Sequence, residues 1–77
     1  MGILLFGVAK DIAGAPVLEK PLHVTDVAGL KAWLYEQYPA LLQLKSIMVA
    51  VNKAYAVDAQ VIDHQDEIAI IPPVSGG

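Results

Sequence analysis

The first hydrophobic run of the chain, Ile3 to Ala9, is short and does not alternate with polar residues. It ends at Lys10 and Asp11 and at the turn-forming residues that follow them, which is typical of a buried strand. The next run, Val17 to Leu22, alternates imperfectly and contains Pro21. Proline cannot donate a hydrogen bond within a sheet, so this run predicts an edge strand. The two runs together predict a hairpin with a long loop.

A helix is expected in the middle of the chain, where hydrophobic residues recur at a helical spacing. These positions are Val27, Leu30, Leu34 and Tyr38. Thr25 is the predicted N-cap, and Asp26 in the first turn suits the positive end of the helix dipole. Pro39 disfavours helical geometry at the residue before it and so ends the helix, and residues 40–44 can form a further short turn.

Two further strands are predicted in the second half of the chain. Ile47 to Val51 is a buried strand followed by a turn at Asn52 to Tyr55, because asparagine tolerates positive φ. Asp58 to Val61 is ambiguous and can hold a short fourth strand. Glu67 to Ile71 lacks alternation, which indicates a central strand covered on both faces. The pattern therefore predicts an α+β domain, in which Val27, Leu30 and Leu34 pack one main helix on one sheet.

Composition narrows the possible functions. The chain has 77 residues, enough for one domain, and contains no cysteine for a disulfide or a thiolate metal site. Its hydrophobic content of 56% is higher than such a small domain can easily bury, which predicts a surface for a protein partner. A net charge of −3 without a single arginine argues against nucleic-acid binding. No segment has the pattern of a signal peptide or the length of a membrane span, so we expect a cytoplasmic protein without membrane contact.

The side chains offer little for catalysis. The serines are Ser46 and Ser75, and the histidines, His23 and His64, fall in separate loops with no third group to orient them. The acidic residues near position 65 do not have the spacing of a calcium loop and are expected to form a solvated loop. We therefore predict neither a metal site nor a bound cofactor.

The end of the chain is the remaining candidate for chemistry. Its last residues are Pro72, Pro73, Val74, Ser75, Gly76 and Gly77. Two prolines after a strand favour an extended exit, and two glycines can pass through a channel too narrow for other residues. A terminal Gly-Gly alone is a weak signal and is also compatible with an unstructured terminus. Its position after a double proline and a buried strand favours a functional tail whose reactive group is the Gly77 carboxylate.

The second half of the chain resembles the MoaD family, the small subunit of molybdopterin synthase within the ubiquitin-like β-grasp group. The similar positions are Val49 to Asn52, Tyr55, Asp58, Ile62, Asp63, Asp66 to Ala69 and Pro72 to Gly77. Upstream, Phe6 to Gly14 is similar to the first strand and loop of the family, and Val24 to Pro39 to its helix. The resemblance implies a β-grasp domain at residues 1–71, with a mixed four- to five-stranded sheet crossed by one main helix, and an extended flexible tail at residues 72–77.

The resemblance also implies a mechanism. An ATP-dependent activating enzyme adenylates the Gly77 carboxylate, and sulfur then replaces AMP to give a thiocarboxylate. The tail, from Pro72 through Gly76, inserts into the large subunit of molybdopterin synthase, where sulfur passes to a pterin precursor to form the dithiolene. The chain is then a non-catalytic subunit of a heterotetramer, and ATP is used by its activating partner.

Three alternatives remain open from the sequence. A carrier for thiazole or tRNA thiolation uses the same kind of tail. A ubiquitin-like modifier joins its terminal glycine to lysines of other proteins. A plain binding module, which is a different class of protein, uses the face of its sheet and does not need the tail.

Overall fold

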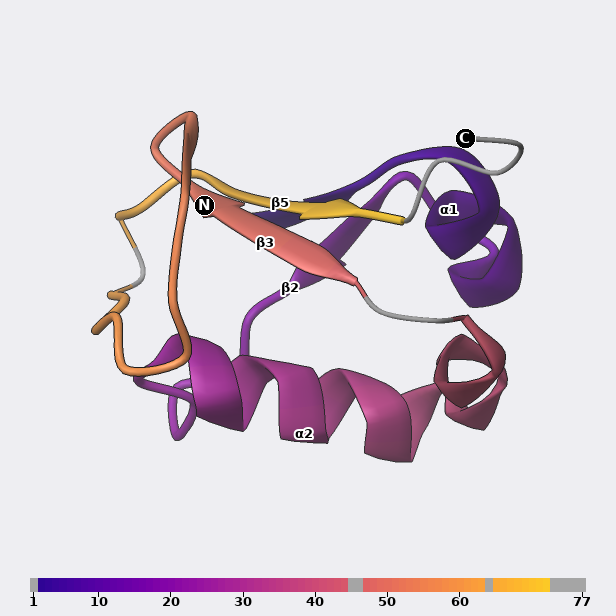
Figure 1. The fold of residues 1–77 in the computed structure, drawn as a ribbon, viewed down its shortest axis with the longest axis horizontal. Helices are drawn as coiled ribbons and strands as arrows, with labels where there is room; N and C mark the ends of the chain where they lie inside the picture. Colours follow the sequence, from indigo (N-terminus) through magenta and orange to yellow (C-terminus); the bar gives the residue numbers. More distant parts are fainter. Residues whose placement is uncertain (1, 45–46, 64, 73–77) are drawn as a thin grey trace.

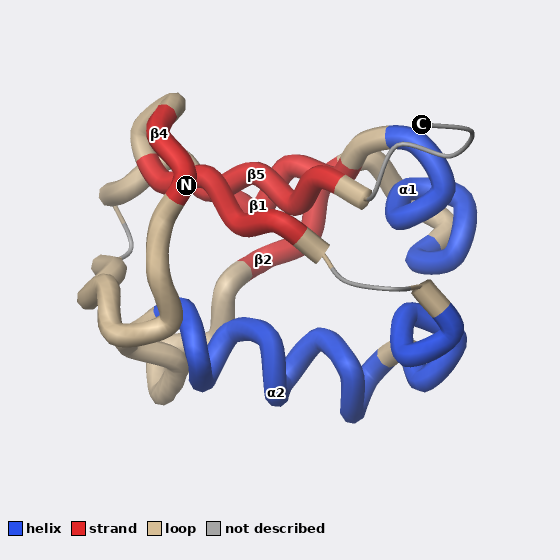
Figure 2. The backbone as a smooth tube through the Cα atoms, in the orientation of Figure 1, coloured by secondary structure: helices blue, strands red, loops and turns tan. Residues whose placement is uncertain are grey.

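The computed structural model describes residues 2–44, 47–63 and 65–72 of the 77-residue chain. In these residues a twisted sheet lies across a long helix, with a shorter helix at one end of the sheet (Figures 1 and 2). The elements, in chain order, are β1 (Gly2–Leu5), α1 (Gly7–Ala13), β2 (Val17–Glu19), α2 (Val27–Gln37), the 3-10 helix η1 (Pro39–Gln43), β3 (Met48–Val51), β4 (Ala54–Tyr55) and β5 (Ile68–Ile71). The predicted α+β class is confirmed.

The described strands form a mixed five-stranded sheet in the order β2-β1-β5-β3-β4. Strand β5 pairs in parallel with β1, with Ile3 opposite Ile68, and antiparallel with β3, with Met48 opposite Ile71. The predicted central position of this strand is confirmed. Strand β2 lies at one edge, as the proline after it predicts, but it ends at Glu19 rather than at residue 22.

The hydrophobic core lies between α2 and one face of the sheet. Val27, Leu30 and Leu34 are fully buried, and they belong to one cluster with inward residues of the three central strands. Those residues are Ile3, Leu5, Val49, Val51, Ile68 and Ile70. The predicted packing of the helix on β3 and β5 is confirmed. Burying each large hydrophobic side chain contributes about 1.5–3 kcal/mol.

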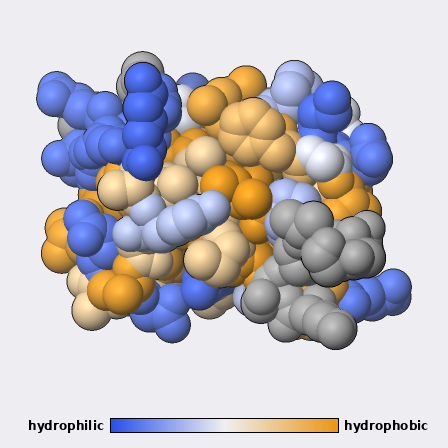
Figure 3. All heavy atoms as spheres, turned by 45° about the horizontal axis from the view of Figure 1, so that its top comes forward, coloured by the Kyte–Doolittle hydropathy of each residue, from blue (hydrophilic) through white to orange (hydrophobic). Residues whose placement is uncertain are grey.

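The opposite face of the sheet also carries hydrophobic side chains. Cross-strand neighbours point to the same side of a sheet, so Leu4, Ala50 and Ala69, which lie opposite one another along β1, β5 and β3, share this face. Figure 3 brings the top of Figure 1 forward and shows hydrophobic atoms across the middle of this surface, with hydrophilic groups around them. Both faces of the sheet are therefore apolar, but α2 covers only the inner one.

The structure corrects the predicted strand at Ile3 to Ala9. The strand ends at Leu5, and Gly7 to Ala9 begin α1 instead. Ala9 is buried and Ile12 and Ala13 pack partly against the core, which is the spacing of one helical face. The helix ends at Gly14, whose φ of 75° suits glycine and whose N–H donates to the Lys10 carbonyl oxygen at 2.9 Å.

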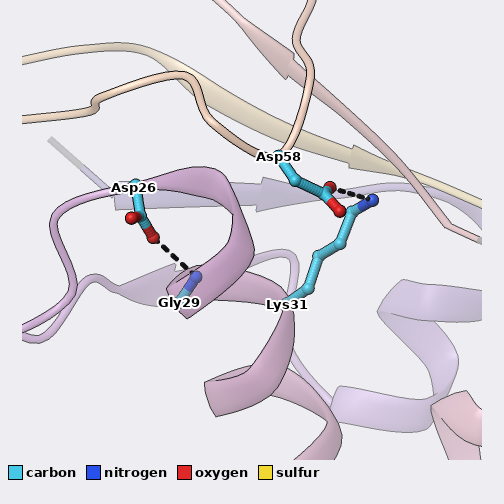
Figure 4. Close-up of polar contacts among 4 residues, drawn as sticks. All are labelled: Asp26, Gly29, Lys31 and Asp58. Carbon is cyan, nitrogen blue, oxygen red and sulfur yellow. Dashed lines mark hydrogen bonds and ion pairs between the residues drawn. The ribbon is translucent and has the colours of Figure 1, made fainter.

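The N-cap of α2 is Asp26, and the prediction of Thr25 was wrong. The Asp26 carboxylate accepts a hydrogen bond from the Gly29 N–H at 2.7 Å (Figure 4). Thr25 cannot take this place because its carbonyl oxygen accepts from the Ile62 N–H at 2.9 Å, which holds the backbone extended one residue earlier. The N–H groups of Val27 and Ala28 donate to carbonyl oxygens at positions 60 and 58, so the loop before β5 completes the cap.

The helix ends as predicted before Pro39, and residues 39–43 form η1, which confirms the predicted short turn. The ambiguous segment at residues 58–61 contributes an isolated bridge between Asp26 and Val61 and no strand of its own. The short strand lies earlier, at Ala54 and Tyr55, after a turn in which Asn52 and Lys53 have φ of 53° and 72°. Two residues with positive φ are what a type I′ hairpin turn requires.

Candidate functional site

The candidate site begins where β5 leaves the sheet. Pro72 is described and half-buried at the end of this strand. The other predicted tail residues, Pro73, Val74, Ser75, Gly76 and Gly77, lie outside the described residues. The assignment of Gly77 as the reactive group therefore remains a prediction.

The strand that leads to the tail is held on both sides up to Ile70 and by β3 alone at Ile71. Ile70 pairs with Leu5 of β1 and Ile71 pairs with Met48 of β3. Ile68 and Ile70 point into the core and are buried, whereas Ile71 points to the outer face. The central strand is thus a firm base for whatever follows residue 72, because two neighbouring strands and the core fix its position.

Helix α1 lies beside this exit. Its first residue, Gly7, is close to the ring of Pro72, and Figure 1 shows the end of β5 reaching toward α1. The residue before the helix, Phe6, accepts hydrogen bonds through its carbonyl oxygen from the N–H groups of Ala9 and Lys10 at 3.2 and 3.4 Å. Pro72, the root of the tail, is therefore bordered by Phe6 and Gly7, which the sequence pattern had predicted to lie in a strand.

The outer face of the sheet carries a hollow of about 360 Å³ next to the root of the tail. Its lining comes from four strands, from the residue before α1, from the turn before β4 and from the residue before β5: Leu4, Phe6, Ala50, Lys53, Tyr55, Glu67, Ala69 and Ile71. Phe6 is 49% exposed, Tyr55 69% and nearby Met48 44%. The residues that line the hollow, together with Met48, are called the outer face below. Their hydrophobic character and their exposure favour contact with another protein.

A polar network fixes the hairpin turn to the loop before β5, at the edge of the outer face. Asn52 donates to Asp66 at 3.0 Å through its amide nitrogen, and its amide oxygen accepts from the Glu67 N–H at 3.0 Å. The Asp63 N–H donates to the second Asp66 oxygen at 2.9 Å. These hydrogen bonds, first that from Asp63 and then that from Asn52, lower the pKa of the Asp66 carboxyl because they favour its charged form. The acidic residues thus have a structural role in this loop.

Among the serines and histidines weighed for catalysis, His23 is the one that lies within the described residues. His23 lies in a shallow groove beside α2 with Trp33 and Glu36, far along the chain from the tail. Ser46, His64 and Ser75 lie outside the described residues. Within residues 2–44, 47–63 and 65–72, no three metal-binding side chains gather, and no helix of this part is long and apolar enough to cross a membrane.

Sequence reasoning missed two features of the site. Phe6 and Gly7 border the root of the tail, but the run Ile3 to Ala9 gave no sign of a helix start. Lys53 and Glu67 provide charged groups beside the hollow. The high hydrophobic content did predict a partner surface, but the uninterrupted run Ile68 to Ile71 gave no sign of which face of β5 belongs to it.

Comparison with known proteins shows the family. The model of the ThiS family matches residues 3–77. The molybdopterin synthase sulfur carrier subunit of Arabidopsis thaliana is 37% identical over an alignment of 78 positions, which covers 97% of this chain and 80% of the relative. The subunit with the same name from Caenorhabditis briggsae is 38% identical, with 97% and 94% of the two chains covered.

Among solved structures, SAMP1 from Haloferax volcanii has a TM-score of 0.80 and 26% identity, and the match covers 100% of this chain and 98% of that one. Its ubiquitin-like fold agrees with the β-grasp arrangement seen here, a mixed sheet crossed by a helix. The sequence match along residues 3–77 and the shared fold lead to one conclusion: this chain belongs to the ThiS family.

Proposed function

We propose that this chain is the sulfur carrier subunit of a molybdopterin synthase and that it carries sulfur as a thiocarboxylate on Gly77. The observation that carries the proposal is the match to molybdopterin synthase sulfur carrier subunits, which extends over 97% of the chain. The Gly-Gly terminus after the central strand supports it, because an acyl donor at the end of a strand can be presented to another protein.

The proposed chemistry takes place at the terminal carboxylate. An activating enzyme joins the Gly77 carboxylate to the AMP part of ATP and releases pyrophosphate. A sulfur donor then attacks the acyl carbon, AMP leaves, and the C-terminal thiocarboxylate forms. In the synthase each carrier passes its one sulfur to the pterin precursor and water restores the carboxylate, so two loaded carriers supply the two sulfurs of one dithiolene.

The roles of the partners follow from this chemistry. We propose that the large subunit of the synthase receives Pro72 through Gly77 and supplies the side chains that act on the pterin, so that the small subunit is a carrier and not a catalyst. The activating enzyme uses ATP, and the carrier itself needs no bound cofactor. Both encounters take place in the cytoplasm.

The outer face supports this arrangement as the surface for the partner. It adjoins the root of the tail through Ile71, and its hydrophobic residues come from strands that are fixed by the core on their other side. A partner that covers this face holds the carrier while the tail enters its active site. Positioning of this kind lowers the barrier to transfer because the reacting groups no longer have to find each other by diffusion.

Three changes at the terminus test the proposal: deletion of Gly77, Gly76→Val and the addition of one residue after Gly77. The purified variants are incubated with the activating enzyme, ATP and a sulfur donor, and intact mass shows whether one sulfur has replaced one oxygen. Wild type should gain the sulfur and should then support dithiolene formation with the large subunit. Each variant should fail, because its acyl group is missing, obstructed or displaced.

Thermal unfolding is the control. All three variants should melt at the wild-type temperature, because every contact among the described residues is unchanged. A Gly77 deletion that accepts sulfur and supports dithiolene formation would exclude the carrier function and leave the plain binding module. Formation of an isopeptide bond to lysines of other proteins, without sulfur transfer to the pterin, would instead favour a ubiquitin-like modifier, as the resemblance to SAMP1 also allows.

A further inference from the structure

The N-terminus of α1 and the root of the tail approach each other closely at Gly7. A Cβ atom on Gly7 would lie 3.2 Å from Cγ of Pro72 and 4.0 Å from its Cδ. The shorter separation is less than the roughly 3.5–4.0 Å at which carbon atoms pack best. A side chain at position 7 would therefore require Pro72 or α1 to shift by a few tenths of an ångström.

Neither side of this contact is free to move away without cost. Gly7 has a φ of 56°, and α1 is anchored because Ala9 is buried in the core. On the other side, Pro72 follows directly on Ile71, which is the last paired residue of the central strand. A displacement forced by a new Cβ would thus fall mainly on Pro72, the first residue that no neighbouring strand pairs.

We propose that Gly7 is a positioning residue for sulfur transfer, because its missing side chain lets Pro72 lie against α1 and so sets the direction in which the tail leaves the sheet. This inference rests on the proposed function of the tail. Gly7 does not touch the reacting atoms and acts through Pro72.

The length of the tail shows why its direction matters. The five residues beyond Pro72 can span at most about 18 Å. A change in the position of Pro72 alters where the Gly77 carboxylate can lie relative to the outer face. The outer face is the surface on which the partner is proposed to be held. Reacting atoms must come within about 3–3.5 Å of each other, and a misplacement of 1 Å can cost on the order of 100-fold in rate.

Gly7→Ala tests the contact, and Gly14→Ala at the other end of the same helix is the matched control. Both glycines have positive φ, so alanine strains the backbone at either position. Around Gly14, however, no atom lies within 4 Å of the added Cβ. Both variants should therefore lose a similar amount of thermal stability, whereas Gly7→Ala alone should slow sulfur transfer to the pterin, by roughly 10- to 100-fold.

Pro72→Ala completes the test, because it removes the ring atoms that the new Cβ would meet. In this background Gly7→Ala should cause little further loss of transfer rate, which a general loss of stability would not produce. The rates are measured in single turnovers with thiocarboxylated protein and saturating large subunit. If Gly7→Ala does not fold, Gly7→Asn replaces it, because asparagine tolerates left-handed backbone better and has the same Cβ.

The outcomes separate the two proposals. If wild-type protein acquires no sulfur or transfers none, the proposed function is wrong. If wild type transfers sulfur and Gly7→Ala matches Gly14→Ala in rate, or if Pro72→Ala does not reduce the effect of Gly7→Ala, the positioning role of Gly7 is overturned and the carrier function stands.

Discussion

Single polar side chains determine how the loops of this small domain are held. The Asp26 carboxylate closes the first turn of α2, and the carboxamide of Asn52 joins the hairpin turn to the loop before β5 through Asp66 and Glu67. The Asp26 carboxylate and the Asn52 amide oxygen each accept a hydrogen bond from a backbone N–H group that would otherwise bond to water. Because the core is small, such local hydrogen bonds contribute a noticeable share of the total stability.

The N-cap of α2 gives a prediction at this scale. Asp26→Ala removes the acceptor of the Gly29 N–H and should lower the free energy of unfolding by about 0.5–2 kcal/mol. Thr25→Ala leaves that hydrogen bond intact and should change it by no more than about 0.5 kcal/mol. Urea unfolding at neutral pH measures both, and equal losses in the two variants would contradict the assignment of the cap to Asp26.

At the scale of elements, α2 and β5 form the centre of the domain. The helix buries Val27, Leu30 and Leu34 on the inner face, and β5 contributes Ile68 and Ile70 to the same core. The Lys31 ammonium of α2 also contacts the Asp58 carboxylate at 2.8 Å (Figure 4). Both groups are partly exposed, so this ion pair contributes little compared with the buried side chains.

Truncation of one buried side chain of α2 tests whether this helix carries the core. Leu34→Ala leaves a cavity in the core and should lower the free energy of unfolding by about 2–5 kcal/mol. Leu22→Ala is the matched control, because Leu22 is 85% exposed and its loss should stay within about 0.5 kcal/mol. Chemical denaturation of both variants decides the point, and an unchanged midpoint for Leu34→Ala would mean that α2 does not carry the core.

The sequence allowed the main helix, the central strand and the edge position of β2 to be predicted, because each has a clear signal. The spacing of Leu30 and Leu34 is helical, Ile68 to Ile71 is uninterrupted, and Pro21 marks an edge. The short helix α1 could not be predicted in the same way. Its inward residues, Ala9, Ile12 and Ala13, have helical spacing, but a helix of seven residues is too short for this period to stand out beside the hydrophobic run before it.

The sequence predicts the chemistry of the candidate site but not its surroundings. Gly76 and Gly77, which lie outside the described residues, predict an acyl donor that fits a narrow channel, and this stays a prediction. The contact between Gly7 and Pro72 joins residues from opposite ends of the chain. It depends on the parallel pairing of β1 with β5 and on the start of α1, neither of which has a local signal in the sequence.

The whole molecule has two hydrophobic surfaces, one on each side of the sheet. The inner surface is covered by α2, and the outer face remains exposed next to the root of the tail. This accounts for the high hydrophobic content of the chain, since a single core of this size cannot contain it. The exposed surface lies where a partner that receives the tail would make contact.

A charge on the outer face should separate binding from folding. Met48→Glu places a carboxylate beside Ile71 and should weaken binding to the large subunit by about tenfold or more, because burying an unpaired polar group costs about 1–3 kcal/mol. Val57→Glu is the control, because Val57 is exposed but lies in the loop after β4 and does not belong to the outer face. Titration calorimetry with the large subunit gives the affinities, and thermal melts check the fold. Equal affinities for the two variants would show that the partner binds elsewhere.

The order of the strands has a consequence for protein synthesis. In the described sheet, β1 with β2 and β3 with β4 are two antiparallel pairs that meet only through β5. The ribosome makes β5 after all four of these strands and before the residues proposed to carry sulfur. A chain that stops before β5 lacks both the strand that unites the two pairs and the Gly77 carboxylate proposed to be activated. We therefore expect the cell to be protected from loading sulfur onto such incomplete copies, since every chain that reaches Gly77 already contains the strand that completes the sheet.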